Sequence, residues 1–253
     1  MKNVWIGLLL AACAAVAGCA DLAGLAGYQG AAGTQSKSAL TQAEIVAGLK
    51  EALKVGTNKA SHQLSATNGY YGDLAVRILL PDEAQVITRN ISKLPGGQTM
   101  VDNVVRGINA AASDAASEAA PIFIDAITSM TIQDGAKILA GGNTAATAYF
   151  KQKTRPQLKK LFASKIDASL QKKIVGNVSA QSSWNTMTTQ WNNVAGSVVG
   201  QVAGLTTVQT DLSDYLTDKA LDGLFTKVGE QEMAIRTKAS ARTSAILQKV
   251  FGR

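Results

Sequence analysis

Histidine and cysteine are scarce in this chain of 253 residues, which contains one histidine and two cysteines. A single histidine excludes metal sites built from several imidazoles. As a general base, His62 would need an oriented nucleophile beside it, and we interpret it instead as an exposed residue on a helix surface. No Gly-x-Ser-x-Gly elbow and no phosphate-binding Gly-x-x-x-x-Gly-Lys loop occurs. The sequence therefore offers no recognisable catalytic set, metal site or cofactor site.

Both cysteines lie in an N-terminal export signal. Lys2 precedes an apolar run from Val4 through Val16, which is shorter than the roughly 20 residues that a membrane-spanning helix needs. The run closes on Val16-Ala17-Gly18-Cys19, which resembles the lipobox of bacterial lipoproteins. Leu10-Ala11-Ala12-Cys13 also fits, but it would leave a short apolar core. We predict that residues 1–18 are a lipoprotein signal peptide and that Cys19 is lipidated, in preference to Cys13.

A lipid on Cys19 would fix the location of the mature protein. Buried acyl chains contribute about 0.8 kcal/mol per methylene, so several chains anchor a protein durably. The predicted location is the cell envelope, and Ala20 after the cysteine favours the periplasmic face of the outer membrane in a bacterium with two membranes. The mature chain would have no free thiol and no disulfide. Loss of Lys2 with the signal peptide takes the formal net charge from +7 to +6, which suits an anionic membrane surface and does not call for a nucleic acid partner.

The remaining sequence predicts a flexible tether followed by one helical domain. Residues 19–40 are rich in glycine, alanine, serine and glutamine, with little to bury. The domain is expected over 41–253, beginning at a capping box from Thr41 to Glu44. Apolar residues then recur at helical spacing, which indicates an all-α fold with a single domain. Further helices are expected near 83–94, 100–120, 122–130, 132–139, 145–162, 212–228 and 246–251.

Two stretches give weaker or mixed signals, and one strong helical pattern has a predicted end. Val76 to Leu80 is a short branched run that can be a strand or a buried helical turn, and we interpret it as helix or extended linker because no partner strand is visible. Residues 177–210 have the least certain pattern, although Trp184 and Trp191 are seven apart and would share a helical face. Gly229 is expected to end the helix that begins near Leu212.

Several separated segments resemble one family, domain of unknown function 4197, over most of the mature chain from about Leu40 to Gly252. The likeness includes Val101-Asp102-Asn103 leading to Asn109, and it is densest in residues 220–225 and 230–232. The resemblance implies a bacterial lipoprotein or periplasmic protein and brings no established activity. Ala110 and Ser113 stand where the family usually has arginine and glutamate, so a charge pair would be missing or relocated to Asp114 and Glu118.

The candidate binding residues are charged or polar positions on the predicted helices. Asp114 and Glu118 are four apart on one face, and with Asp125 they could bind a metal or share a proton. We favour a solvated stripe because no histidine or third carboxylate joins them at helical spacing. The full candidate set is Asn109, Asp114, Glu118, Asp134, Arg236 and Arg242.

Four other features have a structural and a functional interpretation, and we favour the structural one for each. Gly141-Gly142-Asn143-Thr144 leads into a helix whose amides could hold an anion, or it is a helix stop followed by an N-cap. The alanines of 110–120 allow tight packing or leave room for an apolar ligand. The basic residues of 151–165 could face anionic lipid or solvent. Charged residues near the C-terminus could form one ion-pair cluster: Glu230, Glu232, Arg236 and Arg242.

These observations favour a lipid-anchored, non-enzymatic helical module that binds an envelope protein or a small apolar ligand. A purely structural envelope protein is the first alternative. An internal cavity lined by the alanine-rich helix would argue against it. The second alternative is an enzyme that uses carboxylates alone, which would require Asp114, Glu118, Asp125 or Asp134 to converge in a cleft.

Overall fold

The computed structural model describes residues 40–91, 95–175, 178–208 and 211–252. The predicted signal peptide, Cys13, Cys19 and the tether lie outside these residues. Residues from Leu40 onward form one compact unit, and the predicted all-α fold is confirmed. The only strands in the described part are β1 (Lys173–Val175) and β2 (Val178–Ser179), a short antiparallel pair. The α-helices are α1 (Gln42–Ser65), α2 (Gln85–Ile91), α3 (Gly97–Ala116), α4 (Ala119–Thr128), α5 (Ile132–Ala140), α6 (Ala145–Leu170), α7 (Ala180–Ala195), α8 (Val198–Val202), α9 (Ser213–Thr237) and α10 (Ala245–Phe251).

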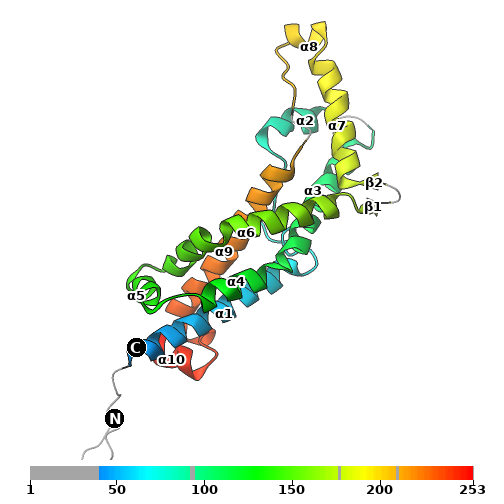
Figure 1. The fold of residues 1–253 in the computed structure, drawn as a ribbon. Helices are drawn as coiled ribbons and strands as arrows, with labels where there is room; N and C mark the ends of the chain where they lie inside the picture. Colours follow the sequence, from blue (N-terminus) through cyan, green and yellow to red (C-terminus); the bar gives the residue numbers. More distant parts are fainter. Residues whose placement is uncertain (1–39, 92–94, 176–177, 209–210, 253) are drawn as a thin grey trace, which may run out of the picture. The chain divides into compact units, whose positions relative to one another are not determined.

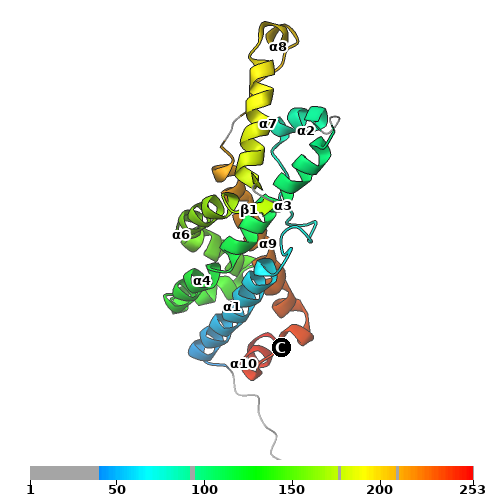
Figure 2. The same ribbon diagram turned by 90° about the vertical axis from the view of Figure 1, so that its right-hand side faces the viewer.

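Helices α1, α3, α6 and α9 form the centre of this unit (Figures 1 and 2). Helix α9 packs against both α6 and α1, and α3 packs against α6. Aromatic residues fill the space where α4, α6 and α9 meet, because Phe123 makes edge-to-face contacts with Phe150 and Phe225. Helix α10 returns to α1 at the C-terminal end of the chain.

Local sequence signals set several helix boundaries as predicted. The Thr41 hydroxyl accepts a hydrogen bond from the Glu44 amide at 3.2 Å, and the Glu44 carboxylate accepts one from the Thr41 amide at 2.9 Å. Thr131 and Asp134 form a second capping box at the start of α5. Both boxes satisfy amides that have no partner within the helix. The predicted capping box at Thr41 is confirmed.

Other boundaries differ from the sequence-based prediction. Helix α9 does not end at Gly229 but continues to Thr237. Glycine inside a helix costs about 1 kcal/mol relative to alanine. Burial of Ile235 and the hydrogen bonds that Glu232 accepts from the first amides of α6 outweigh that cost. Helix α3 ends at Ala116 rather than near residue 120, and Pro121 lies in the first turn of α4, where its missing amide is tolerated.

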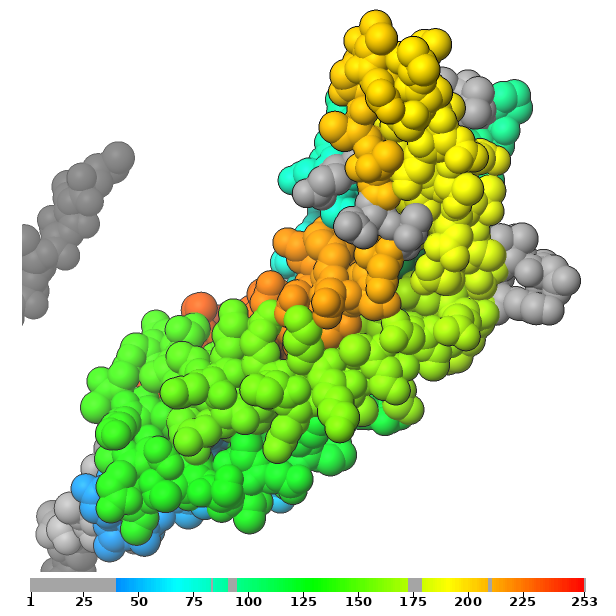
Figure 3. Space-filling model, turned by 45° about the horizontal axis from the view of Figure 1, so that its top comes forward, coloured from blue at the N-terminus to red at the C-terminus, as the bar shows by residue number. Residues whose placement is uncertain are grey.

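Helices α7 and α8 with the chain up to residue 208 form a segment that we call the arm. Figure 3 shows it in yellow, extending past the green atoms of α6. Trp184 and Trp191 are both buried on one face of α7, as their spacing predicts. The helix begins at a Ser179 capping box with Ser182, which the sequence analysis did not identify.

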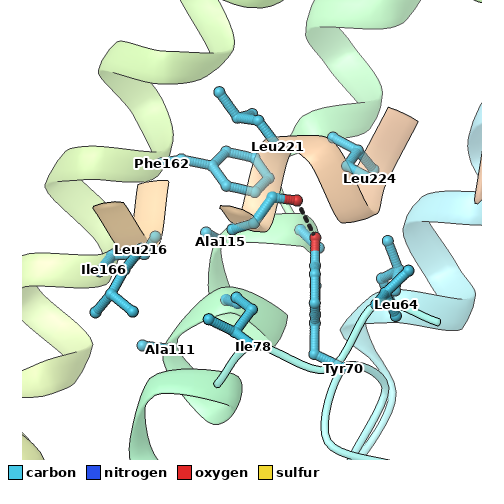
Figure 4. Close-up of a cluster of buried hydrophobic side chains, with 14 of the residues drawn as sticks. Leu64, Tyr70, Ile78, Ala111, Ala115, Phe162, Ile166, Leu216, Leu221 and Leu224 are labelled. Atoms are coloured by element: carbon cyan, nitrogen blue, oxygen red, sulfur yellow. Dashed lines mark hydrogen bonds between the residues drawn. The ribbon is translucent and has the colours of Figure 1, made fainter. Parts of the chain in front are cut away.

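The alanine-rich face of α3 is packed rather than hollow. Figure 4 shows Ala111 and Ala115 among larger apolar side chains, including Ile78, Phe162 and Ile166. Both alanines are about 1% exposed or less. The small side chains therefore allow neighbouring elements to approach closely, which is the structural interpretation that the sequence favoured.

Candidate functional site

An open groove of about 850 Å³ lies along the chain segment between α1 and α2. Residues 75–82 form one side of it. Helix α2 contributes Thr88, helix α3 contributes Val101 and Val105, and helix α9 contributes Tyr215 and Lys219. The groove thus joins an irregular segment to three helices, and its lining is mixed in chemistry rather than purely apolar.

The segment beside the groove has the burial pattern of a half-buried strand. Val76, Ile78 and Leu80 are buried, whereas Leu79 between them is 60% exposed. Such alternation is typical of an extended chain, whose side chains point alternately to opposite sides. The residue before a proline also prefers an extended conformation, and Pro81 follows this segment. Val76 ends a turn in which the Val76 and Arg77 amides donate to the Asp73 carbonyl at 3.1 and 2.8 Å, and residues 77–80 belong to no helix or strand. The prediction of a linker is confirmed for residues 77–80, where the helical alternative is wrong.

Asn109 holds this segment in place. Its side-chain oxygen accepts a hydrogen bond from the Ile78 amide at 2.8 Å, and its side-chain nitrogen donates one to the Ile78 carbonyl at 2.8 Å. One residue exchanging both bonds with a partner is the pattern of a pair in an antiparallel ladder. The asparagine amide therefore takes the place of a neighbouring strand. Asn109 is 1% exposed, so it is a positioning residue rather than a ligand-contacting one.

Two further contacts attach the loop before the segment to α9. The hydroxyl of buried Tyr70 donates to the Ala220 carbonyl at 2.7 Å (Figure 4). A side chain at Gly223 would place its Cβ 2.8 Å from the Tyr70 ring, so only glycine fits there.

The second contact is an ion pair. Lys227 pairs with Asp73 at 2.6 Å and with Glu230 at 2.8 Å. Burial alone would lower the pKa of Lys227, but hydrogen bonds to both carboxylates outweigh it and raise the pKa.

Two cations without a carboxylate partner in the described residues, Arg77 and Lys219, line the groove together with the carboxylates Asp82 and Asp222. Asp222 is paired with Arg155 of α6 at 2.9 Å. In the described part of the chain, the Arg77 side chain donates to the Tyr71 carbonyl at 2.6 Å and its guanidinium lies 4.5 Å from the centre of the Tyr71 ring. Lys219 lies 5.6 Å from the centre of the Tyr215 ring. Cation–π contacts of this kind leave the positive charge available to an anionic group. The sequence analysis missed both residues because they are separated along the chain.

The predicted carboxylate pair is split between Lys165 of α6 and Lys172, which follows the end of that helix. Asp114 contacts Lys172 at 2.7 Å and Ser169 at 2.8 Å, whereas Glu118 pairs with Lys165. Burial raises the pKa of Asp114, but the Lys172 and Ser169 hydrogen bonds outweigh it and the net shift is downward. The two carboxylates join helices and do not line the groove.

The other predicted carboxylates also lie apart. Asp134 is engaged in its capping box, where hydrogen bonds with Thr131 lower its pKa, and Asp125 is exposed on α4. Within the described residues, no three Asp, Glu, His or Cys side chains are grouped to hold a metal. His62 is exposed on α1, as predicted.

The first amides of α6 hold a carboxylate of the same chain. Glu232 accepts hydrogen bonds from the Ala146 amide at 3.0 Å and from the Thr147 amide at 2.8 Å. Arg236 donates to Glu232 at 3.0 Å and to the Ile138 carbonyl at 3.0 Å. A helix N-terminus favours negative charge. The Glu232 carboxylate therefore occupies the possible anion site that the sequence analysis noted after Gly141 and Gly142. The predicted side-chain cap at Thr144 is wrong.

The predicted ion-pair cluster near the C-terminus is smaller than expected. Glu232 and Arg236 form a pair, but Glu230 contacts Lys227 instead. Arg242 donates to the carbonyls of Ile235 and Arg236, both at 3.0 Å. Arg242 therefore stabilises the end of α9 through backbone groups, and it makes no ion pair within the described part of the chain.

The basic segment of α6 faces α9 over part of its length. Arg155 contacts Asp218 and Asp222, both at 2.9 Å, and Lys159 contacts Asp218 at 3.1 Å. These pairs neutralise part of the positive charge that the sequence concentrates there. They also account for Asp218 and Asp222 of α9, to which the sequence analysis assigned no role.

No helix in the described ranges combines the length and the apolar character needed to cross a bilayer. Comparison with curated proteins and with solved structures found no match. The family model described as protein of unknown function, DUF4197, matches residues 39–252. This match covers most of the chain and confirms the resemblance found in the sequence segments. The chain belongs to the DUF4197 family.

Proposed function

We propose that this protein is a non-enzymatic binding module of the bacterial cell envelope, with the groove beside residues 75–82 as its ligand site. A lipid on Cys19 would hold it at the membrane, on the periplasmic side of the outer membrane. The groove is the observation that carries the proposal. Its volume of about 850 Å³ falls within the range of roughly 300–1,000 Å³ that is usual for ligand sites.

The lining of the groove supports binding rather than a purely structural role. Elsewhere, the predicted charged candidates are engaged in caps and ion pairs that join helices. At the groove, exposed Leu79 and the cations Arg77 and Lys219 form no cap and no ion pair within the described residues. Asn109 and Tyr70 fix the segment from beneath, so the groove has a preorganised wall.

The lining also indicates the character of the ligand. Valine side chains of α3 offer apolar contact, and Arg77 and Lys219 offer positive charge beside Asp82 and Asp222. Asp222 is already paired with Arg155, whereas the two cations have no carboxylate partner in the described residues. A ligand with both apolar and acidic groups suits this combination better than a purely apolar molecule. The packed alanine face of α3 gives no support to a carrier site inside the helical core.

Native mass spectrometry of the protein recovered from an envelope extract tests the binding site. The mature chain would carry Cys19→Ser and would be extracted gently in three forms: unaltered, Leu79→Asp and Leu74→Asp. Leu74 is 82% exposed but does not line the groove, so it is the matched control. We expect a discrete adduct that is lost only in Leu79→Asp. A clean apo mass for the unaltered chain, or an equal adduct in all three, would reject the proposal.

The anchor requires a separate measurement. Intact-mass analysis of the full-length chain, expressed in a bacterium with two membranes, should show a diacylglycerol-modified Cys19 in the membrane fraction. Cys19→Ser should abolish the modification, and Cys13→Ser should retain it. Modification that survives Cys19→Ser would show that the lipidation site was assigned wrongly.

A further inference from the structure

We infer that the groove binds an extended peptide segment of a partner protein, which lies alongside residues 77–79 as an added parallel strand. This inference rests on the proposed function and names the class of ligand. The partner segment is defined by its chemistry: an extended backbone with an aliphatic side chain and a carboxylate side chain.

The backbone of the segment supplies the first argument. Asn109 occupies both polar groups of Ile78, on one edge of the chain. In an extended chain, the polar groups of the residues before and after point to the opposite edge. Among the described residues, neither the Arg77 carbonyl nor the Leu79 amide has a hydrogen-bond partner. A donor and an acceptor two residues apart therefore remain unpaired next to the groove.

This arrangement selects the direction of the incoming chain. In a parallel pair, a single residue of the added strand donates its amide to the carbonyl before the facing residue and accepts from the amide after it. The free Arg77 carbonyl and Leu79 amide are the two groups that such a residue would bond. Tyr215 already donates to the Leu79 carbonyl at 3.0 Å, which leaves that carbonyl less available to an antiparallel partner.

Side chains around the groove supply the second argument. Val101 and Val105 of α3 are partly buried against the core and also line the groove, so they can receive an aliphatic side chain. Arg77 and Lys219 have no carboxylate partner in the described part of the chain. Strand addition gains affinity from main-chain bonds and specificity from such side-chain contacts.

The other exposed apolar surface does not provide an alternative occupant from a second copy. The three most exposed valines lie in α8 and are helical, so they cannot supply an extended strand. A small ligand could fill the volume, but it would not require a free amide and a free carbonyl at this spacing. The backbone groups therefore favour a peptide.

The test uses a phage-displayed library of random linear nine-residue peptides, selected against the mature chain with Cys19→Ser. The dissociation constant of the best synthetic peptide would be measured by calorimetry for the unaltered chain, Leu79→Ala and Leu79→Pro. Leu79→Ala keeps the amide, whereas Leu79→Pro removes it. We expect Leu79→Pro to bind about tenfold more weakly than Leu79→Ala, as for the loss of one main-chain hydrogen bond.

A second measurement does not depend on the Pro variant folding. Each backbone amide of the peptide would be N-methylated in turn, and one position should lose binding far more than its neighbours because it donates to Arg77. Lys219→Gln should weaken peptides that carry a carboxylate and leave matched amide peptides unchanged. Failure of any peptide to be enriched, equal binding by Leu79→Pro and Leu79→Ala, or a flat N-methyl scan would overturn the inference.

The outcome for the peptide is separable from that for the proposed function. If the native adduct disappears in Leu79→Asp but no peptide is enriched, the inference fails and the groove remains a ligand site. If the native adduct is the same in the unaltered, Leu79→Asp and Leu74→Asp forms, the proposed function fails, and the peptide inference that rests on it fails too.

Discussion

The seam between α6 and α9 and the arm formed by α7 and α8 are stabilised in different ways. At the seam, Arg155 and Lys159 pair with carboxylates of α9. The arm has no such groups, because the sequence contains no charged residue between Lys173 and Asp211. Instead, Trp191 donates to the Thr206 carbonyl at 2.9 Å, and Asn192 exchanges two hydrogen bonds with Val208, at 2.8 and 2.9 Å.

The comparison shows that the same asparagine hydrogen-bonding arrangement occurs at two places in the molecule. Asn192 binds both backbone groups of Val208 in the way that Asn109 binds those of Ile78. In each case, an asparagine on a helix satisfies an extended residue that has no neighbouring strand, which avoids leaving a polar group unpaired. Only at Ile78 does the opposite edge of the extended chain border a large groove.

Glu232→Ala should produce the largest loss of stability at the seam. It removes a buried carboxylate that caps α6 and leaves Arg236 without its ion-pair partner. We expect the free energy of unfolding to fall by about 3 kcal/mol, measured by urea denaturation. Glu230→Ala is the control, because Glu230 is exposed and Lys227 keeps Asp73 as a partner. Equal effects of the two variants would contradict the assigned role of Glu232.

Asn192→Ala should loosen the arm while leaving the seam intact. The variant leaves the amide and carbonyl of Val208 without partners, which costs about 2 kcal/mol. We expect faster amide hydrogen exchange in residues 192–208 and unchanged exchange in α9. Asn193→Ala changes an exposed neighbour and should have no effect. Faster exchange throughout the unit would show that the arm is not a separate element of stability.

Acid should weaken the seam and the helix starts before it affects the arm. Hydrogen bonds from Lys249 and Thr41 lower the pKa of Glu44 to about 2. Burial raises the pKa of Asp218, but Lys159 and Arg155 outweigh it, so the net shift is downward. Carboxylates with lowered pKa values stabilise the fold above their unfolded-state pKa, near 4. That contribution is lost as the pH falls through the folded-state pKa.

We therefore expect the free energy of unfolding to decrease between about pH 4.5 and pH 2. Urea denaturation at several pH values would measure this change. The Asp218→Asn variant should flatten part of the curve, and Asp211→Asn, an exposed residue outside the seam, should not. A pH-independent free energy over this interval would contradict the assignment.

The smallest effect is expected for the exposed valines of the arm. Val198, Val199 and Val202 are 78%, 79% and 85% exposed. Replacing all three with serine should change the free energy of unfolding by no more than about 0.5 kcal/mol, because they bury little surface. A loss above about 1 kcal/mol in urea denaturation would show that these side chains pack against the fold.

Local sequence patterns determined most of the helices and several of their boundaries. The capping boxes at Thr41 and Thr131, the helical spacing of apolar residues and the seven-residue interval between Trp184 and Trp191 depend only on neighbours along the chain. Such signals can be read directly because their partners are at most two helical turns away. The alanine-rich segment was likewise correctly interpreted as a packing surface.

Tertiary structure decided the role of nearly every candidate site residue. Glu232 caps a helix that begins 87 positions earlier in the sequence, at Ala145, and Asn109 binds a residue 31 positions away. Helix α9 passes through Gly229 because the buried residues after it outweigh the local preference to stop. These outcomes depend on which surfaces meet in space, and the identity of a packing or hydrogen-bonding partner on a distant element has no signature in the local sequence.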